Sequence, residues 1–339
     1  MNITTLVTGA TSGLGRNAAE FLARQGCTVR TTGRNRAAGE ALKAIGTEFA
    51  PLDLASASSA DLERLLQGVD AVWHCAALSS PWGAWSDFHT ANVLATSHLA
   101  HAAVAKGVRR FVHISTPSLY FDFNHRLDIE ETFRPARYVN HYASTKAQAE
   151  DVIRTVAAAN PDITFVTLRP RGIFGPHDRV LLPRILRLLR ERGGRLPLPR
   201  AGTAQIDLTY VGNVVHAMRL ATTCRDVRSG EAFNITNNES TCLRDVLDAL
   251  LTRLGMVYRI KDVPYPVLDL AARAMQRWAA VSGREPLLTR YSVGALNYDM
   301  TLSTRKAQQV LGYQPRWTLQ QSIEETVNWI KAHGDDYGL

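Results

Sequence analysis

The stretch Ile3-Thr-Thr-Leu-Val-Thr8, followed directly by Gly9-Ala-Thr-Ser-Gly13-Leu-Gly15, decides the fold. The first run is short and apolar, as in a buried strand, and the periodicity of residues 16–25 predicts a helix. A strand, a glycine turn and a helix in this order favour nucleotide binding over an ordinary connection, because the helix N-terminus offers free N–H groups to a pyrophosphate. We therefore predict cofactor contacts from Gly9, Thr11, Ser12, Gly13, Leu14 and Gly15.

The end of the next predicted strand, 27–32, indicates which cofactor is bound. In NAD-binding units an acidic residue near this point hydrogen-bonds the ribose 2′-hydroxyl. Here Thr32 and Gly33 stand in that place, and Arg34 and Arg36 follow. A guanidinium suits the additional phosphate of NADP. We predict that NADP(H) is preferred, with NAD(H) and a merely solvated arginine pair as the alternatives.

Strands and helices continue to alternate through the first half of the chain. Strands are predicted at 48–51, 71–77, 110–115 and 163–168, and helices at 61–67, 88–106 and from Tyr142 to about 159. Repeated units of this length imply an α/β fold with a Rossmann-type doubly wound parallel sheet. Ligands bind beyond the carboxyl ends of such strands. Further cofactor contacts are therefore predicted from Asp53, Leu54, Ala76 and Ala77.

The alternation weakens after residue 178. A seventh strand is predicted at 232–235, and helices at 180–192, about 213–221, 243–254, 267–281, 303–311 and 319–332, with Ser303 as the N-cap of the fifth. We predict an NADP-binding Rossmann domain over 1–178, completed by about 203–240. A smaller, mostly helical substrate cap is predicted over 179–202 and 241–339. Ordinary cap packing is predicted for 267–281, with a lid or a membrane-surface contact as alternatives.

The composition limits the classes of function. The chain has 339 residues, 45% of them hydrophobic and 21% charged, which is typical of a globular protein. The net charge is +8, but no nucleic-acid motif accompanies the arginine-rich run at 179–200, so no nucleic-acid partner is predicted. Neither a signal peptide nor an apolar run of about 18 residues is found, so we predict no membrane span. The four cysteines lack the paired spacing of a zinc site or a disulfide framework (Cys27, Cys75, Cys224 and Cys242). We therefore predict no metal and a reducing, cytoplasmic setting.

The stretch Tyr142-Ala-Ser-Thr-Lys146 carries the predicted chemistry. Residues four apart share one face of a helix, with Cβ atoms about 5–6 Å apart. A phenol ionises at about pH 10, and an ammonium fixed beside it favours the phenolate. The spacing alone more often means an exposed pair. However, the strand at 110–115 ends in Ser115-Thr116-Pro-Ser-Leu-Tyr120, whose hydroxyls emerge where a ligand is expected.

With these residues in view, the chain resembles the extended short-chain dehydrogenase/reductases over essentially its whole length. The shared marks are the glycine turn, His74-Cys-Ala-Ala77, Asn92-Val93, Ser115-Thr116, Tyr142 to Lys146, Arg169-Pro170 and Gly175-Pro176. Within that family it looks most like the 3β-hydroxysteroid dehydrogenase branch, and especially the bacterial 2-alkyl-3-oxoalkanoate reductases. One departure is Ser12, which stands where extended members usually have glycine.

The resemblance implies the roles of the site residues. Tyr142 is implied as the catalytic acid/base, and Lys146 as the group that lowers its pKa and holds the nicotinamide ribose. The hydroxyl that holds the substrate oxygen falls on Thr116, with Ser115 as the second candidate. Further implied cofactor contacts are Asn92, Pro170, Gly172 and Ile173.

The resemblance also implies the reaction and the assembly. It implies hydride transfer between NADPH and a small keto or hydroxy substrate, such as a β-keto acid or a steroid-like 3-oxo compound. A nucleotide-sugar epimerase or dehydratase is the alternative, and a cofactor-sensing regulator without chemistry is a third class. A homodimer through the 88–106 helix and the Tyr142 helix is also expected.

Overall fold

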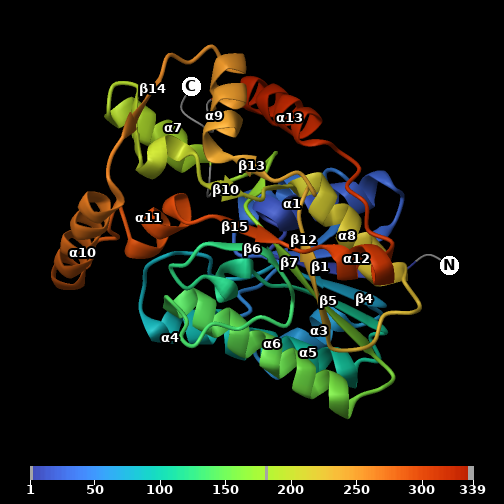
Figure 1. The fold of residues 1–339 in the computed structure, drawn as a ribbon. Helices are drawn as coiled ribbons and strands as arrows, with labels where there is room; N and C mark the ends of the chain where they lie inside the picture. Colours follow the sequence, from blue (N-terminus) through green and yellow to red (C-terminus); the bar gives the residue numbers. More distant parts are fainter. Residues whose placement is uncertain (1–2, 180–181, 335–339) are drawn as a thin grey trace.

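A parallel sheet of seven strands forms the centre of the structure, a computed structural model that describes residues 3–179 and 182–334 (Figure 1). The strands lie in the order β12-β7-β5-β4-β1-β2-β3, and every neighbouring pair is parallel. They are β1 (Thr4–Thr8), β2 (Thr28–Gly33), β3 (Glu48–Pro51), β4 (Ala71–His74), β5 (Arg110–Ile114), β7 (Thr164–Pro170) and β12 (Glu231–Ile235). The predicted Rossmann-type α/β fold is confirmed.

Helices cover both faces of this sheet (Figure 1). On one face lie α3 (Ser59–Leu66), α5 (Ala95–Ala105) and α6 (His141–Ala159), whose apolar side chains share a core with Leu6 and Phe111. On the other face lie α1 (Gly13–Arg24), α8 (Val211–Thr223) and α12 (Arg305–Leu311), around Val7 and Val112. Burial on both faces explains why consecutive residues of the central strands β1, β4, β5 and β7 are buried, with no alternation between buried and exposed positions.

The remaining elements build a smaller cap above the carboxyl edge of the sheet. Its core is formed by α7 (Leu182–Glu191), α9 (Leu243–Arg253), α13 (Leu319–Ala332) and the strand pair β9 (Arg195–Leu198) and β14 (Arg259–Asp262). A second small sheet contains β6 (Arg126–Ile129), β15 (Met300–Leu302), β10 (Gln205–Ile206) and β13 (Thr241–Cys242). Leu14 and Ile173 pack against the cores of both the sheet and the cap. The glycine turn thus lies at the junction of the two.

Several elements differ from the prediction for local reasons. Helix α2 (Arg36–Lys43) was not predicted, although the Asn35 side chain accepts from the Ala38 N–H as its cap. The predicted 88–106 helix starts earlier, as α4 (Trp85–Phe88), and passes through a π turn, η1 (His89–Leu94), before α5. The predicted fourth strand ends at His74 rather than residue 77, because the chain turns there toward the glycine loop.

Two C-terminal predictions are also corrected. The N-cap of α12 is Thr304 and not Ser303, whose hydroxyl instead accepts a hydrogen bond from Arg305 Nε (3.0 Å). Helix α12 falls within the range predicted as cap, yet it packs in the core of the sheet. The predicted start of the 180–192 helix lies outside the described residues.

Helix α10 (Tyr265–Ser282) packs through one face only. Leu268, Ala272 and Ala279 are buried, and α11 (Arg290–Asn297) is its neighbour. Its other face leaves large apolar side chains in solvent, among them Trp278 (71% exposed) and Val281 (84%). The prediction of ordinary cap packing therefore holds for half of this helix. Among the helices of residues 3–179 and 182–334, none has the length and hydropathy to cross a bilayer.

A buried ion pair fixes α6, the helix that carries Tyr142 and Lys146. Arg169 at the end of β7 donates from Nε and Nη2 to the two carboxylate oxygens of Glu150 (2.8 and 2.5 Å). Both side chains are almost fully buried. Arg169 Nη1 also donates to the Tyr120 hydroxyl and to the Glu131 carbonyl (2.9 Å). The bidentate geometry fixes the rotation of α6 against the sheet.

Replacing Glu150 by Gln should lower the free energy of unfolding by about 3–5 kcal/mol, because the Arg169 guanidinium stays buried without its counter-charge. Burial raises the pKa of Glu150, but Arg169 more than offsets this, so that pKa is held below its ordinary 4.5. The carboxylate therefore stabilises the fold above that pH, and its contribution is lost as the pH falls through the lowered value. Urea unfolding at pH 7 and at pH 3.5 measures both effects, and the deficit of the variant should be smaller at pH 3.5.

The matched control is Glu48→Gln, which removes a carboxylate that is 63% exposed and pairs with Arg30 (2.9 Å). This change should cost less than about 1 kcal/mol. Equal losses from the two variants would show that the Glu150 pair is not a structural clamp.

Candidate active site

The glycine turn after β1 is shaped by close backbone contacts. Gly9 has φ of +65°, and a Cβ there would lie 2.9 Å from Cα of Ala76, in the loop after β4. A Cβ on Gly15 would lie 2.3 Å from the Gly9 carbonyl oxygen. The two glycines therefore let α1 begin directly against the turn, while Ala76 closes it from the neighbouring strand. This is the cradle that a pyrophosphate needs.

The N-terminus of α1 is left without an internal anion. Its N-cap, Ser12, makes no side-chain capping bond, and the first turn holds no acidic residue. Within the described residues, the Gly13 N–H donates to the His177 carbonyl (3.2 Å), and Asn17 Nδ2 donates to the carbonyls of Gly13 and Pro176 (2.9 and 2.8 Å). These bonds tie the turn to the segment after β7. The uncapped helix end suits a bound phosphate.

The structure gives a steric reason for the absence of an acid at the end of β2. A Cβ on Gly33 would lie 2.7 Å from Cγ2 of Thr11, in the glycine turn. Thr11 is β-branched and cannot easily move aside. Arg34 and Arg36 are exposed on either side of the α2 cap, and in the described part of the chain neither forms an ion pair. Their guanidinium groups are available for a ligand.

Other predicted cofactor residues occupy different positions. Asp53 and Ala77 are exposed. Leu54 is only 8% exposed, and its side chain packs in the core of the sheet. Asn92 is buried in the π turn. Its amide oxygen accepts from the Leu78 N–H (2.7 Å), and its nitrogen donates to the Leu78 carbonyl (3.1 Å) and to Thr145 (3.2 Å). Asn92 thereby positions the loop after β4 against α6, and its direct contact with the cofactor stays a prediction.

Tyr142 lies beside Thr116 and Ser79 at the start of α6. Burial raises the pKa of Tyr142, and hydrogen bonding with Ser79 and Thr116 partly opposes this. The Lys146 ammonium is not among the groups that act on the phenol, which differs from the predicted lowering of its pKa. The net effect is a pKa above the ordinary 10 of a tyrosine, so Tyr142 is protonated at neutral pH and able to donate a proton.

Lys146 is buried and held by β5. Its Nζ donates to the Ile114 carbonyl (2.7 Å) and to His113 Nε2 (3.1 Å). Burial lowers the pKa of His113 well below 6.5, so its ring is neutral. Because an ammonium is only a donor, Nε2 of the neutral ring must accept. Burial lowers the pKa of Lys146 to about 8, with Glu150 and Cys75 opposing the shift. The side chain is therefore still mainly charged at neutral pH.

The two hydroxyls after β5 have different surroundings. Thr116 accepts from the Ser118 N–H (3.1 Å) and donates to the Ser118 hydroxyl (3.0 Å), on the side of Tyr142. Ser115 is buried on the side of Glu150, and its hydroxyl contributes to lowering the pKa of that carboxyl. Of the two candidates, Thr116 is therefore the one beside the phenol.

The cap brings a residue that the sequence did not single out. The Tyr291 hydroxyl, from α11, lies 2.6 Å from the Ser118 hydroxyl. A chain of hydroxyls thus runs from Tyr142 through Thr116 and Ser118 to the cap. Tyr291 is 173 residues away from Ser118 in sequence, and no local motif marks it.

The segment after β7 borders the same place. Pro170 is buried at the end of the strand, and Gly172 has φ of +56°, with Leu208 2.7 Å from where its Cβ would be. Ile173 begins β8 (Ile173–Phe174), which pairs with β11 (Thr209–Tyr210). The segment follows β7, which lies next to β5 in the sheet, and contact of these residues with the nicotinamide stays a prediction.

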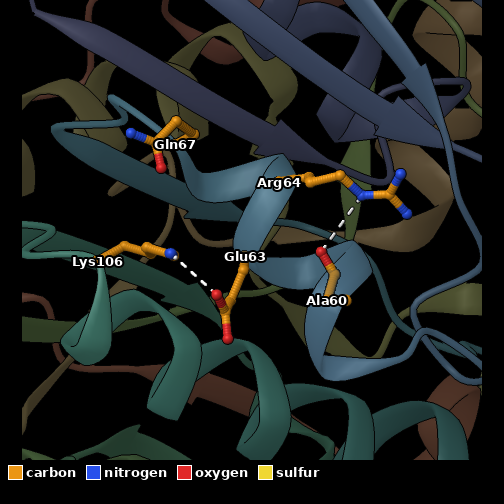
Figure 2. A pocket seen from close by; sticks show the side chains of 5 residues that line it. All are labelled: Ala60, Glu63, Arg64, Gln67 and Lys106. Atoms are coloured by element: carbon orange, nitrogen blue, oxygen red, sulfur yellow. Dashed lines mark hydrogen bonds and ion pairs between the residues drawn. The ribbon is translucent and has the colours of Figure 1, made fainter.

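A shallow surface pocket lies elsewhere, between α3 and α5 (Figure 2). It is lined by Ala60, Glu63, Arg64, Gln67 and Lys106. The Lys106 ammonium pairs with the Glu63 carboxylate (3.0 Å), so the charges of this pocket are satisfied internally. It contains none of the predicted site residues and is not the candidate active site.

Comparison with known proteins agrees with this geometry. A family model described as "NAD dependent epimerase/dehydratase family" matches residues 5–236, which contain the glycine turn, Thr116, Tyr142 and Lys146. The chain belongs to the NAD-dependent epimerase/dehydratase family. The predicted membership in the extended short-chain dehydrogenase/reductases is confirmed at this level, and an NAD(P)-dependent oxidoreductase is the function typical of the family.

Three relatives in the family match almost the whole chain. The "Uncharacterized protein YbjS" of Escherichia coli is 49% identical, covering 97% of this chain and 98% of its own. The "4-hydroxy-2-methyl-3-oxo-4-farnesyl-3,4-dihydroquinoline-1-oxide ketoreductase" of Stigmatella aurantiaca is 32% identical, covering 94% of each. The "2-alkyl-3-oxoalkanoate reductase" of Stenotrophomonas maltophilia is 32% identical, covering 96% and 98%.

A solved structure shows the same fold. The UDP-glucuronic acid 4-epimerase of Bacillus cereus in complex with NAD superposes with a TM-score of 0.78 at 21% identity, covering 97% of this chain and 96% of that chain. At this identity the likeness concerns the fold alone. The glycine turn of the present chain nevertheless fits the family's dinucleotide, through the uncapped α1 N-terminus and the closely approached Gly9. Arg34 and Arg36, which have no ion-pair partner among the described residues, fit its additional phosphate.

Replacing Gly15 by Ala should weaken NADP(H) binding about tenfold or more, because the new methyl group overlaps the Gly9 carbonyl and an overpacked contact costs about 1–3 kcal/mol. Isothermal titration calorimetry measures the dissociation constant. The control is Gly26→Ala, just after the far end of α1, where a Cβ meets no atom within 4 Å but φ is +71°. This change strains the backbone without touching the glycine turn, so it should lower stability and leave cofactor binding unchanged. If both variants bind the cofactor like the wild type, the glycine turn is not the pyrophosphate site.

Proposed function

We propose that this family member is an NADPH-dependent ketoreductase of the 3β-hydroxysteroid dehydrogenase branch, acting on a 3-oxo compound. The observation that carries the proposal is the Tyr142 phenol beside the Thr116 hydroxyl, which follows the carboxyl end of β5. The names of the two relatives at 32% identity, a ketoreductase and a 3-oxoalkanoate reductase, support the same reaction type.

The residues divide the reaction between them. A bound reduced nicotinamide would supply the hydride. Tyr142 donates its proton to the substrate oxygen as negative charge develops there, and its raised pKa keeps that proton available at neutral pH. Thr116 turns its hydroxyl hydrogen from Ser118 to the same oxygen and stabilises the growing charge.

Lys146 has a positioning role in this proposal. Its ammonium is held by the Ile114 carbonyl and the His113 ring at the end of β5, and it has a third N–H that neither of them uses. That donor would hold a ribose hydroxyl of the cofactor. Since burial lowers the pKa of Lys146 to about 8, cofactor binding should weaken as the pH rises above that value.

Nucleotide-sugar epimerisation is the alternative that the family name suggests. A dehydratase normally has an acidic pair after the threonine, whereas Pro117 and Ser118 stand here, and Ser118 is already engaged by Tyr291. An epimerase would retain its cofactor through each cycle. Purified protein that carries a bound nicotinamide and converts a UDP-sugar without net NADPH consumption would overturn the ketoreductase proposal.

Replacing Tyr142 by Phe should lower kcat for NADPH-dependent reduction of a 3-oxo substrate about 100-fold or more, which is the usual contribution of a general acid. The dissociation constant for NADPH should stay within severalfold, since the ring remains. Stopped-flow absorbance at the nicotinamide band measures the hydride step. Tyr138→Phe, a partly exposed tyrosine before the same helix, is the control. Near-normal turnover in the Tyr142 variant would refute the assigned acid.

Replacing both Arg34 and Arg36 by Ala should reduce the preference for NADPH over NADH at least about tenfold, because each charged hydrogen bond to a phosphate contributes about 1.5–3 kcal/mol. The ratio of kcat/KM for the two cofactors is the measurement. Arg179 and Arg192 lie in the other arginine-rich run and provide a double-alanine control. An unchanged ratio in the Arg34 and Arg36 variant would show that the arginines are merely solvated.

A further inference from the structure

Arg171, directly after β7, has an incompletely paired guanidinium at the edge of the active site. Its Nη1 donates to the sulfur of Met300 (3.0 Å), a weak acceptor, and its Nε is buried without a partner. Among residues 3–179 and 182–334, no carboxylate oxygen lies within ion-pair distance of Arg171. The neighbouring Arg169, by contrast, has a bidentate carboxylate partner.

The backbone holds Arg171 in place. Its N–H donates to the Ile235 carbonyl of β12 (3.2 Å), and its own carbonyl accepts from the Thr209 hydroxyl (2.6 Å). Gly172 follows with φ of +56°. The guanidinium is therefore displayed from a fixed point of the structure, which is what recognition of a ligand requires.

The charge of Arg171 is not neutralised locally. Burial lowers its pKa, while Tyr291 and Asp207 oppose the shift from a distance. The Asp207 carboxylate is already used, because it accepts from the Leu302 N–H (2.6 Å) and from the Ser240 hydroxyl (2.8 Å). A guanidinium remains charged in proteins, and a buried charge without a counter-ion is costly. The position is thus prepared for an anion from outside the chain.

Arg171 is connected to the catalytic groups on the substrate side. Tyr291 acts electrostatically on both Arg171 and Tyr142, so it lies near both of them. The Tyr291 hydroxyl bonds Ser118, which accepts from Thr116. Arg171 and the hydroxyls of Thr116 and Ser118 thus have Tyr291 as a common neighbour.

We propose that Arg171 binds a carboxylate of the substrate, so that the compound reduced is a 3-oxo acid rather than a neutral ketone. The proposal rests on the proposed ketoreductase function. The carboxylate takes no part in the redox step: hydride adds to the carbonyl carbon, a proton adds to its oxygen, and the acid group leaves unchanged. The names of the relatives at 32% identity include both an alkanoate and a quinoline oxide, so a carboxylate is not common to the two names.

The test compares an acid with its ester in wild type and Arg171→Gln. Oxidation of a 2-alkyl-3-hydroxyalkanoate with NADP⁺ avoids 3-oxo acids, which lose carbon dioxide spontaneously, and the methyl ester of the same hydroxy acid is the neutral partner. Wild type should prefer the acid by about 100-fold in kcat/KM, and Arg171→Gln should reduce that ratio at least about 30-fold, since the lost bonds are bidentate and charged. Arg171→Lys should restore part of the ratio.

Arg110→Gln is the matched control. Arg110 also has a buried, unpartnered nitrogen (Nη1) and a pKa lowered by burial, but it lies at the amino end of β5, the opposite edge of the sheet. This variant should keep the wild-type ratio. The dissociation constant for NADP⁺, measured by calorimetry, should be the same in Arg171→Gln and wild type, because the anion bound is the substrate's.

Each other outcome has a distinct meaning. An unchanged acid-to-ester ratio in Arg171→Gln, or equal losses for acid, ester and NADP⁺, would overturn the proposal in favour of a structural or cofactor role. If wild type oxidises neither compound, the ketoreductase proposal fails. The carboxylate site is then judged by calorimetry of the acid and ester with NADP⁺-saturated protein, and binding of the acid that Arg171→Gln does not weaken would reject it.

Discussion

The buried ion pair between Arg169 and Glu150 is the constraint on which the site depends. It joins β7 to α6, the helix that carries Tyr142 and Lys146. Arg169 also donates to the Tyr120 hydroxyl, which in turn donates to Asn234 Oδ1 on β12 (2.9 Å). Two charges out of water tolerate little change in geometry, because any separation leaves each without compensation. The catalytic helix therefore has one position along the sheet and one rotation about its own axis.

Burial then sets the protonation state of each group at that edge. It raises the pKa of Tyr142, which keeps the proton that a reductase must donate, and it lowers the pKa of Lys146 without removing its charge at neutral pH. The His113 ring stays neutral and accepts from Lys146. Burial thus favours a neutral phenol at Tyr142, while the charge of Lys146, one helix turn away, is retained at neutral pH.

The sequence predicted those features of the fold that depend on residues close together in the chain. The glycine turn is readable because Gly9 and Gly15 are needed by the backbone itself, and the strands are readable because they are buried on both faces. Nothing in the sequence shows that the Asn92 side chain is hydrogen-bonded to Leu78 and Thr145, or that Ser115 lies beside Glu150. Such partners are distant in the chain, and only the packing of α6 against the sheet determines them.

The cap explains why reaction type and substrate class are separable in this fold. In the proposed reaction, the groups that donate a proton or a hydrogen bond follow β5 or lie on α6, and the ion pair fixes α6 against the sheet. Tyr291 and Met300, by contrast, come from the cap side and approach through Ser118 and Arg171. Substitution in the cap can therefore change what is bound without moving Tyr142. Arg171 belongs to the sheet by its backbone but meets the cap through its guanidinium. In the proposed reaction it is therefore the residue through which this edge of the sheet selects for the charge of the substrate.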